Sequence, residues 1–134
     1  MKRDFSTKIE IKKLDIKSDE RGWLTEILST SDSGNKPFGL IHVTTAKPGF
    51  VKGKHHHKRK TEWFCVIKGE AKLMLKDLKT KESRVIHLGE GNMLVVKIPP
   101  NIFHSIENIG NDEMYLLAYV DEAFDPKDPD TYYE

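Results

Sequence analysis

The chain has 134 residues, a length that fits one domain spanning residues 1–134, and its 22 Lys and Arg nearly balance its 21 Asp and Glu. A net charge of +1 argues against nucleic-acid binding through bulk charge. No apolar run reaches the length of a membrane span or a secretory signal, so we expect neither, and no membrane partner. Cys65 is the only cysteine, which rules out an intrachain disulfide and predicts a cytoplasmic protein.

Nearly every segment shows the alternation of polar and apolar residues that is typical of short, half-buried strands. In chain order, we expect strands at residues 8–11, 12–16, 23–28, 38–45, 63–67, 71–76, 84–88, 93–98, 104–108 and 114–120. Composition predicts a loop at 29–36, a hairpin turn at 68–70, and only turns or a short 3₁₀ segment at the Pro-containing end, 124–133. No window has a sustained helical stripe, so the sequence predicts an all-β sandwich or small barrel.

Histidine is concentrated between Gly49 and Gly69, where His55 and His57 are followed by Glu62. If His55 and His57 lie on a strand, its period of two puts both imidazoles on one face, and His56 points away. Glu62 follows a short basic turn and can reach the same point from the next antiparallel strand. These donors predict a divalent metal site, and they suit zinc, iron, manganese or nickel about equally.

This stretch resembles the first motif of the cupin superfamily, G-x5-H-x-H-x(3,4)-E-x6-G, and fills all its fixed positions. The second cupin motif, G-x5-P-x-G-x2-H-x3-N, is matched at Pro99, His104 and Asn108, but Asn101 replaces its inner glycine and Gly91 lies two residues early. The resemblance implies a double-stranded β-helix, the cupin or jelly-roll barrel, with little or no helix. It also implies that His104 is a fourth metal ligand, beside His55, His57 and Glu62.

Two further segments, Asp19–Trp23 and Glu122–Thr131, resemble the nucleotide-sugar cupins, which are 4-keto-sugar 3,5-epimerases and 3,4-ketoisomerases. The second segment is most similar to the C-terminal cupin domain of the reductase–epimerases of capsular polysaccharide synthesis, a domain that binds zinc. The resemblance implies a homodimeric epimerase that acts at C3, with C5 as a second position, of a 4-keto-6-deoxy sugar on a nucleoside diphosphate. A 3,4-ketoisomerase and a non-catalytic sugar-binding partner of a separate reductase remain alternatives.

The same resemblance assigns roles in proton transfer. His55 corresponds to the base of the rhamnose-type epimerases, and Tyr119 on the last strand to their acid, although Tyr119 could also be an ordinary core or dimer-face residue. Those metal-free enzymes carry a lysine where this chain has Phe64. A histidine bound to metal cannot also be a free base, because its lone pair is occupied. His42, Tyr119 or a metal-activated water would then take the proton.

Substrate contacts are also implied by the resemblance. Arg21 corresponds to an arginine that grips the diphosphate from the neighbouring subunit. Lys52, Lys54, Arg59 and Lys60 could assist it, although Arg59 and Lys60 could equally belong to a solvated basic turn. Trp23 could stack on a uracil or thymine ring, or simply pack against the protein.

Overall fold

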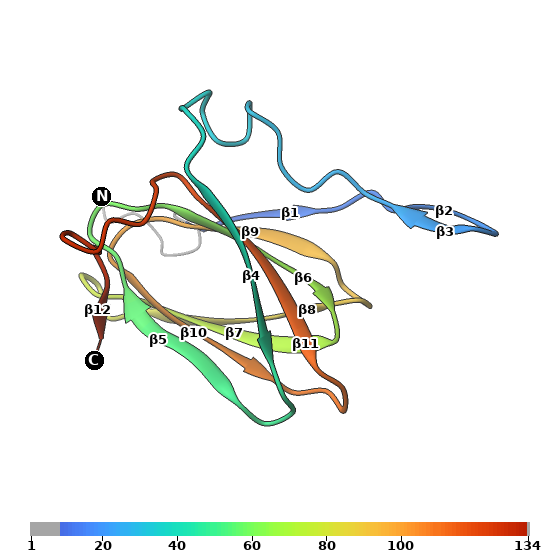
Figure 1. Ribbon diagram of the computed structural model, residues 1–134. Helices are drawn as coiled ribbons and strands as arrows, with labels where there is room; N and C mark the ends of the chain where they lie inside the picture. The colour runs from blue at the N-terminus through green and yellow to red at the C-terminus, as the bar shows by residue number, and fades with distance from the viewer. Residues whose placement is uncertain (1–8, 134) are drawn as a thin grey trace.

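The computed structural model describes residues 9–133, and this part of the chain contains strands and turns but no helix (Figure 1). It therefore holds no helical segment that could span a membrane. The strands are β1 (Glu10–Lys13), β2 (Lys17–Asp19), β3 (Gly22–Leu24), β4 (Leu40–Ala46), β5 (Val51–His56), β6 (Glu62–Lys68), β7 (Glu70–Asp77), β8 (Ser83–Gly89), β9 (Leu94–Ile98), β10 (Ile102–Asn108), β11 (Met114–Val120) and β12 (Tyr132–Tyr133).

Two five-stranded antiparallel sheets make up the body of the protein. One has the strand order β1-β9-β6-β11-β4 and the other β12-β5-β10-β7-β8. Consecutive strands often lie in different sheets, as β5, β6 and β7 do, and this is the jelly-roll arrangement. The prediction of an all-β double-stranded β-helix is therefore confirmed. Hydrogen bonds between the described strands do not close the two sheets into a continuous barrel.

The main core lies between the sheets and follows from strand alternation. On β7, Ala71, Leu73 and Leu75 are fully buried and point inward, whereas Met74 between them is exposed. A second, smaller cluster lies on the outer face of β6 and β9 and contains Trp63 and Cys65. Cys65 is therefore a buried core residue.

The predicted hairpin between residues 63–67 and 71–76 is wrong. β6 pairs with β9 and β11, whereas β7 pairs with β8 and β10 in the other sheet. Gly69, with a φ of 85°, turns the chain from one sheet to the other, and a Cβ there would lie 3.1 Å from the Cα of Met114. The metal-site prediction placed Glu62 on the antiparallel strand next to that of His55 and His57. This is also wrong, because β5 and β6 lie in opposite sheets.

Both ends of the chain differ from the prediction. The predicted strands at 12–16 and 23–28 are wrong in their bounds: β1 ends at Lys13, β2 begins at Lys17, and β3 ends at Leu24. β2 and β3 form a hairpin that projects from the barrel (Figure 1). At the other end, Tyr132 and Tyr133 form β12, which pairs with His56 and His55 of β5. The expectation of turns or a short 3₁₀ segment was wrong there, because both prolines of this segment, Pro126 and Pro129, lie before these residues.

Candidate metal centre

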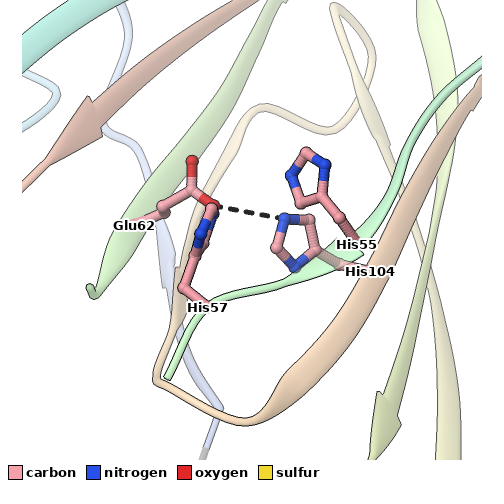
Figure 2. A group of neighbouring side chains, drawn as sticks. All are labelled: His55, His57, Glu62 and His104. Atoms are coloured by element: carbon pink, nitrogen blue, oxygen red, sulfur yellow. Dashed lines mark hydrogen bonds and ion pairs between the residues drawn. The ribbon is translucent and has the colours of Figure 1, made fainter. Parts of the chain in front are cut away.

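Four side chains converge inside the barrel from both sheets (Figure 2). His55 lies on β5, His57 follows its end, Glu62 begins β6, and His104 lies on β10. One ligand atom from each of these residues lies within 4.8 Å of the others. The four side chains therefore lie close together, as predicted, although Glu62 extends from the facing sheet and not from an adjacent strand.

Local backbone geometry explains how His55 and His104 meet. They are paired across β5 and β10, and the register shifts between His104 and Ser105. Gly53 lies opposite this irregularity with a φ of 91°, and a Cβ there would be 3.1 Å from the backbone oxygen of His104. The imidazole rings of His55 and His104 are 4.8 Å apart in an edge-to-face contact.

Glu62 is the negative charge of the cluster. Its Oε1 lies 2.8 Å from Nε2 of His57 and 3.1 Å from Nε2 of His104. Burial alone would raise the pKa of the Glu62 carboxyl, but the contacts with His104 and His57 outweigh burial and hold this pKa well below its usual range. Glu62 is therefore a buried carboxylate at neutral pH.

The histidines respond differently to the same surroundings. Burial, together with the neighbouring His104 and His57, lowers the pKa of His55 to about 4, so its ring is neutral at pH 7. Burial also acts to lower the pKa of His57, but its hydrogen bond to Glu62 prevails and raises it. A neutral imidazole has a lone pair available for a metal ion or a proton.

Backbone carbonyls orient two of the rings. Nδ1 of His57 donates to the Asp130 carbonyl at 2.6 Å, and Nδ1 of His104 donates to the Ile102 carbonyl at 3.0 Å. Both rings therefore direct Nε2 at Glu62. This pattern is typical of metal-bound histidines, whose second nitrogen usually donates to a carbonyl or carboxylate.

The donor set fits a divalent metal ion. Among the described residues, the buried Nδ1 of His55 has no hydrogen-bond partner, and Nε2 of His104 lies 3.1 Å from the Glu62 carboxylate. Buried polar atoms are normally satisfied, so an unpartnered ring nitrogen in a cluster with a buried carboxylate fits a site that binds a cation. Three imidazoles and one carboxylate are ligands that zinc and other first-row metals accept.

The four residues line a cavity of about 290 Å³. Its other polar side chains are those of His42, Thr44, Lys52, Lys60 and Thr131, and its apolar lining includes Phe64 and Phe124. For Lys60 the sequence left open a phosphate contact or a solvated basic turn, and the residue is only 5% exposed. The spacing of the sequence could have indicated this position, because Lys60, Glu62 and Phe64 follow one another at intervals of two residues and all three line the cavity. Lys54 is exposed and does not line it.

Tyr119 lies on the other side of the sheet from the candidate metal centre. Its side chain does not line the cavity, so the expectation that it serves as the acid in this cavity is wrong. Val120 pairs with Glu62 and faces the cavity, which turns Tyr119 outward, where it packs against Phe38 and Trp63. The Tyr119 hydroxyl accepts a hydrogen bond from the Gly39 backbone N–H at 2.9 Å. A separate outer cavity of about 410 Å³ is lined by this tyrosine.

The structure does not bring Arg21 or Trp23 to the cavity within one chain. Both lie on the projecting β2–β3 hairpin, where Trp23 is 53% exposed. Arg21 pairs with Asp19 of the same hairpin at 2.6 Å. Any contact of these residues with a metal centre would therefore have to be made in a second copy of the chain.

Two facing jelly-roll sheets with a His/Glu cluster between them define the protein as a cupin. The sequence model of the polysaccharide biosynthesis C-terminal domain family matches residues 17–132, and the chain belongs to this family. That match includes the projecting hairpin, the four converging residues and the first residue of β12.

Two relatives from bacteria illustrate the similarity. The chain is 38% identical, over 86% of its length, to a UDP-2-acetamido-2,6-beta-L-arabino-hexul-4-ose reductase of Pseudomonas aeruginosa, but spans only 30% of that protein. It is 28% identical, over 91% of its length, to the spore coat polysaccharide biosynthesis protein SpsL of Bacillus subtilis, of which it spans 84%. The domain thus occurs both within a much longer chain and in a chain of similar length.

Solved structures agree with the fold. The capsular polysaccharide assembling protein CapF of Staphylococcus aureus superposes with a TM-score of 0.70 at 34% identity, covering 90% of this chain and 34% of CapF. A dTDP sugar isomerase of Desulfovibrio desulfuricans superposes with a TM-score of 0.85 at 20% identity, covering 94% of this chain and 83% of that one. The latter identity is low, so this likeness supports the fold alone.

Proposed function

We propose that this chain is a zinc-binding epimerase that acts on a nucleotide-linked 4-keto-6-deoxy sugar in cell-surface polysaccharide biosynthesis. The observation that carries the proposal is one cavity that joins a buried His/Glu metal site to two side chains, His42 and Lys60, that can move or stabilise charge. The family match and the names of the relatives support the substrate class. The single cysteine and a nucleotide-sugar substrate favour a cytoplasmic location.

His55, His57, Glu62 and His104 would hold the metal ion. A bound zinc ion supplies Lewis-acid stabilisation of negative charge on a carbonyl oxygen, an effect worth several kcal/mol in general. The chain's own contribution is a preformed ligand set. Two of its three rings are oriented by backbone carbonyls, and its carboxylate stays ionised despite burial.

Epimerisation next to a ketone needs a base for the α-proton. Tyr119 is on the wrong side of the sheet, and the lone pair of His55 is occupied if His55 binds metal. His42 on β4 lines the same cavity and is not one of the converging ligands, so we assign it as the base. Without metal, His55 would be the alternative, since its low pKa keeps the ring neutral.

Cationic side chains would hold the diphosphate and developing negative charge. Lys52 and Lys60 both reach the cavity, and we assign them this role. We further propose a homodimer in which the β2–β3 hairpin of one copy brings Arg21 and Trp23 to the other copy. An isolated two-stranded hairpin is marginally stable in water, which favours its docking on a second protein surface. Lys54 would lie at the rim.

The experiment is solvent exchange in D₂O. The purified chain is incubated with UDP-linked and dTDP-linked 4-keto-6-deoxy sugars, and the products are analysed by mass spectrometry and NMR. We expect deuterium at C3 in the wild type. His42→Gln should slow exchange about 10²–10⁴-fold, the usual contribution of a positioned base, whereas His87→Gln, an exposed histidine on β8, should not slow it.

The outcomes separate the alternatives. A product whose carbonyl has moved from C4 to C3 identifies a ketoisomerase. No deuterium at C3 or C5 in a metal-loaded protein that still binds nucleotide sugar excludes both reactions and leaves a binding module. Full exchange in His42→Gln and in the metal-free wild type, with loss of exchange in His55→Gln, would return the role of base to His55.

A further inference from the structure

The acidic C-terminal segment, residues 121–133, lies against the basic turn that follows His57, and we call it the C-terminal strap. Asp130 is its anchor and is only 2% exposed. The Asp130 carboxylate accepts hydrogen bonds from three successive backbone N–H groups, those of Lys58 at 3.0 Å, Arg59 at 2.9 Å and Lys60 at 3.0 Å. Its side chain therefore fixes the turn between two metal-ligand positions, 57 and 62.

The backbone of the strap reaches the metal centre itself. The Asp130 carbonyl accepts the hydrogen bond from Nδ1 of His57 at 2.6 Å. The neighbouring Pro129 carbonyl accepts from Nζ of Lys60 at 3.0 Å. Two side chains of the cavity are thus held by consecutive carbonyls of a segment about 70 residues further along the chain.

The carboxylate and the carbonyl of Asp130 depend on each other. Asp130 has a φ of 52°, in the left-handed region that L residues other than Asn and Asp seldom adopt. The three N–H contacts hold the residue in that conformation, which directs its carbonyl at His57. Without the carboxylate, the strap would lose the contacts that keep the carbonyl within reach of the ring.

We propose that Asp130 is a positioning residue for the metal centre: through its carboxylate it locks the turn, and through its carbonyl it sets the proton position and direction of His57. The inference rests on the proposed metal site. Groups that orient a metal-bound histidine typically change metal affinity 10–100-fold when they are lost. Asp130 would act without touching either metal or substrate.

The test uses the full chain and zinc alone. Zinc affinity is measured by competition with a chromophoric chelator for wild type, Asp130→Ala, Asp130→Asn and Asp128→Asn. Asp128→Asn is the matched control, because Asp128 is exposed on the same strap and its carboxylate pairs with Arg59 and not with the turn backbone. We expect about a 10–100-fold weaker affinity in Asp130→Ala. A smaller loss is expected in Asp130→Asn, which keeps an acceptor oxygen and tolerates the same φ, and no loss in Asp128→Asn.

A second readout follows His57 directly. In ¹⁵N-edited NMR, the Nδ1 proton of His57 should exchange slowly with water in the wild type and rapidly in Asp130→Ala. If the wild type binds zinc and folded Asp130→Ala and Asp130→Asn bind it equally well, the inference is overturned while the metal site stands. If the wild type itself binds no divalent metal, both the metal site and this inference fall.

Discussion

Glu62→Gln in the metal-free protein should reveal how much the buried carboxylate stabilises the fold. The substitution keeps shape and volume but removes the charge that contacts His57 and His104. A hydrogen bond to a charged group contributes about 1.5–3 kcal/mol, and the 2.8 Å contact with His57 has the geometry of one. Because Gln retains a neutral acceptor, we expect a loss of about 2–3 kcal/mol in the free energy of unfolding near pH 6.

The loss should depend on pH with a defined sign. The pKa of His57 is raised above 6.5 in the folded protein, so its stabilising contribution is complete below about pH 6.5 and disappears as the pH rises through the raised pKa. The pKa of Glu62 is lowered from 4.5, so its contribution is present above about pH 4.5 and disappears at lower pH. The difference between wild type and Glu62→Gln should therefore be largest between these values.

Urea unfolding in the presence of EDTA, followed by tryptophan fluorescence, measures this difference at pH 5.5, 7 and 8.5. Glu107→Gln is the control, because Glu107 pairs with Lys72 at 3.4 Å on the surface, where an ion pair contributes about 0–1 kcal/mol. A loss in Glu62→Gln no larger than in Glu107→Gln would refute the reasoning. So would a difference that stays constant between pH 5.5 and 8.5.

Three further outcomes are expected. His104→Ala should weaken zinc binding by more than the roughly 10–100-fold typical of outer-shell changes, as measured by chelator competition, while His87→Ala leaves the affinity unchanged. Burial raises the pKa of Cys65 to about 11, so a thiol reagent at pH 8 should label it only after unfolding, and labelling of the folded chain would contradict its core position. Leu73→Ala, at a fully buried site, should cost about 2–5 kcal/mol in urea unfolding, whereas Met74→Ala beside it should cost about 0.5 kcal/mol or less.

The strands could be predicted from the sequence because the alternation of polar and apolar residues within a strand shows which of its faces is buried. β7 alternates between fully buried and more exposed positions along most of its length, and the predicted strand at 71–76 lies within it. Strand pairing could not be predicted in the same way. A glycine turn such as Gly69 serves a hairpin or a crossover equally well, so the sequence could not show that β6 and β7 lie in different sheets.

The candidate site shows the same limit. The candidate ligands His55 and His57 could be predicted because spacing along a strand determines which side chains share a face, whereas His104 was implied by the resemblance to the second cupin motif. Tyr119 was misplaced because its direction depends on register: the pairing of Val120 with Glu62 decides which residues of β11 face the cavity. Lys60 could have been assigned by alternation from Glu62, but its charge and its place in a basic turn favoured an exposed position.

His57 shows why this centre can exist before any ion arrives. Both nitrogens of its ring are engaged, Nδ1 by the Asp130 carbonyl and Nε2 by Glu62. A flip of the ring would break both hydrogen bonds, so the strap and the carboxylate together hold one orientation. In the sequence, the basic turn and the acidic C-terminal segment are two separate stretches of opposite charge. In the structure, Asp130 of the acidic segment binds the backbone of the basic turn beside His57. The geometry of the candidate metal ligands is thus built by the chain's own hydrogen bonds, and an ion that displaced the proton between Nε2 of His57 and Glu62 would find the ring already oriented.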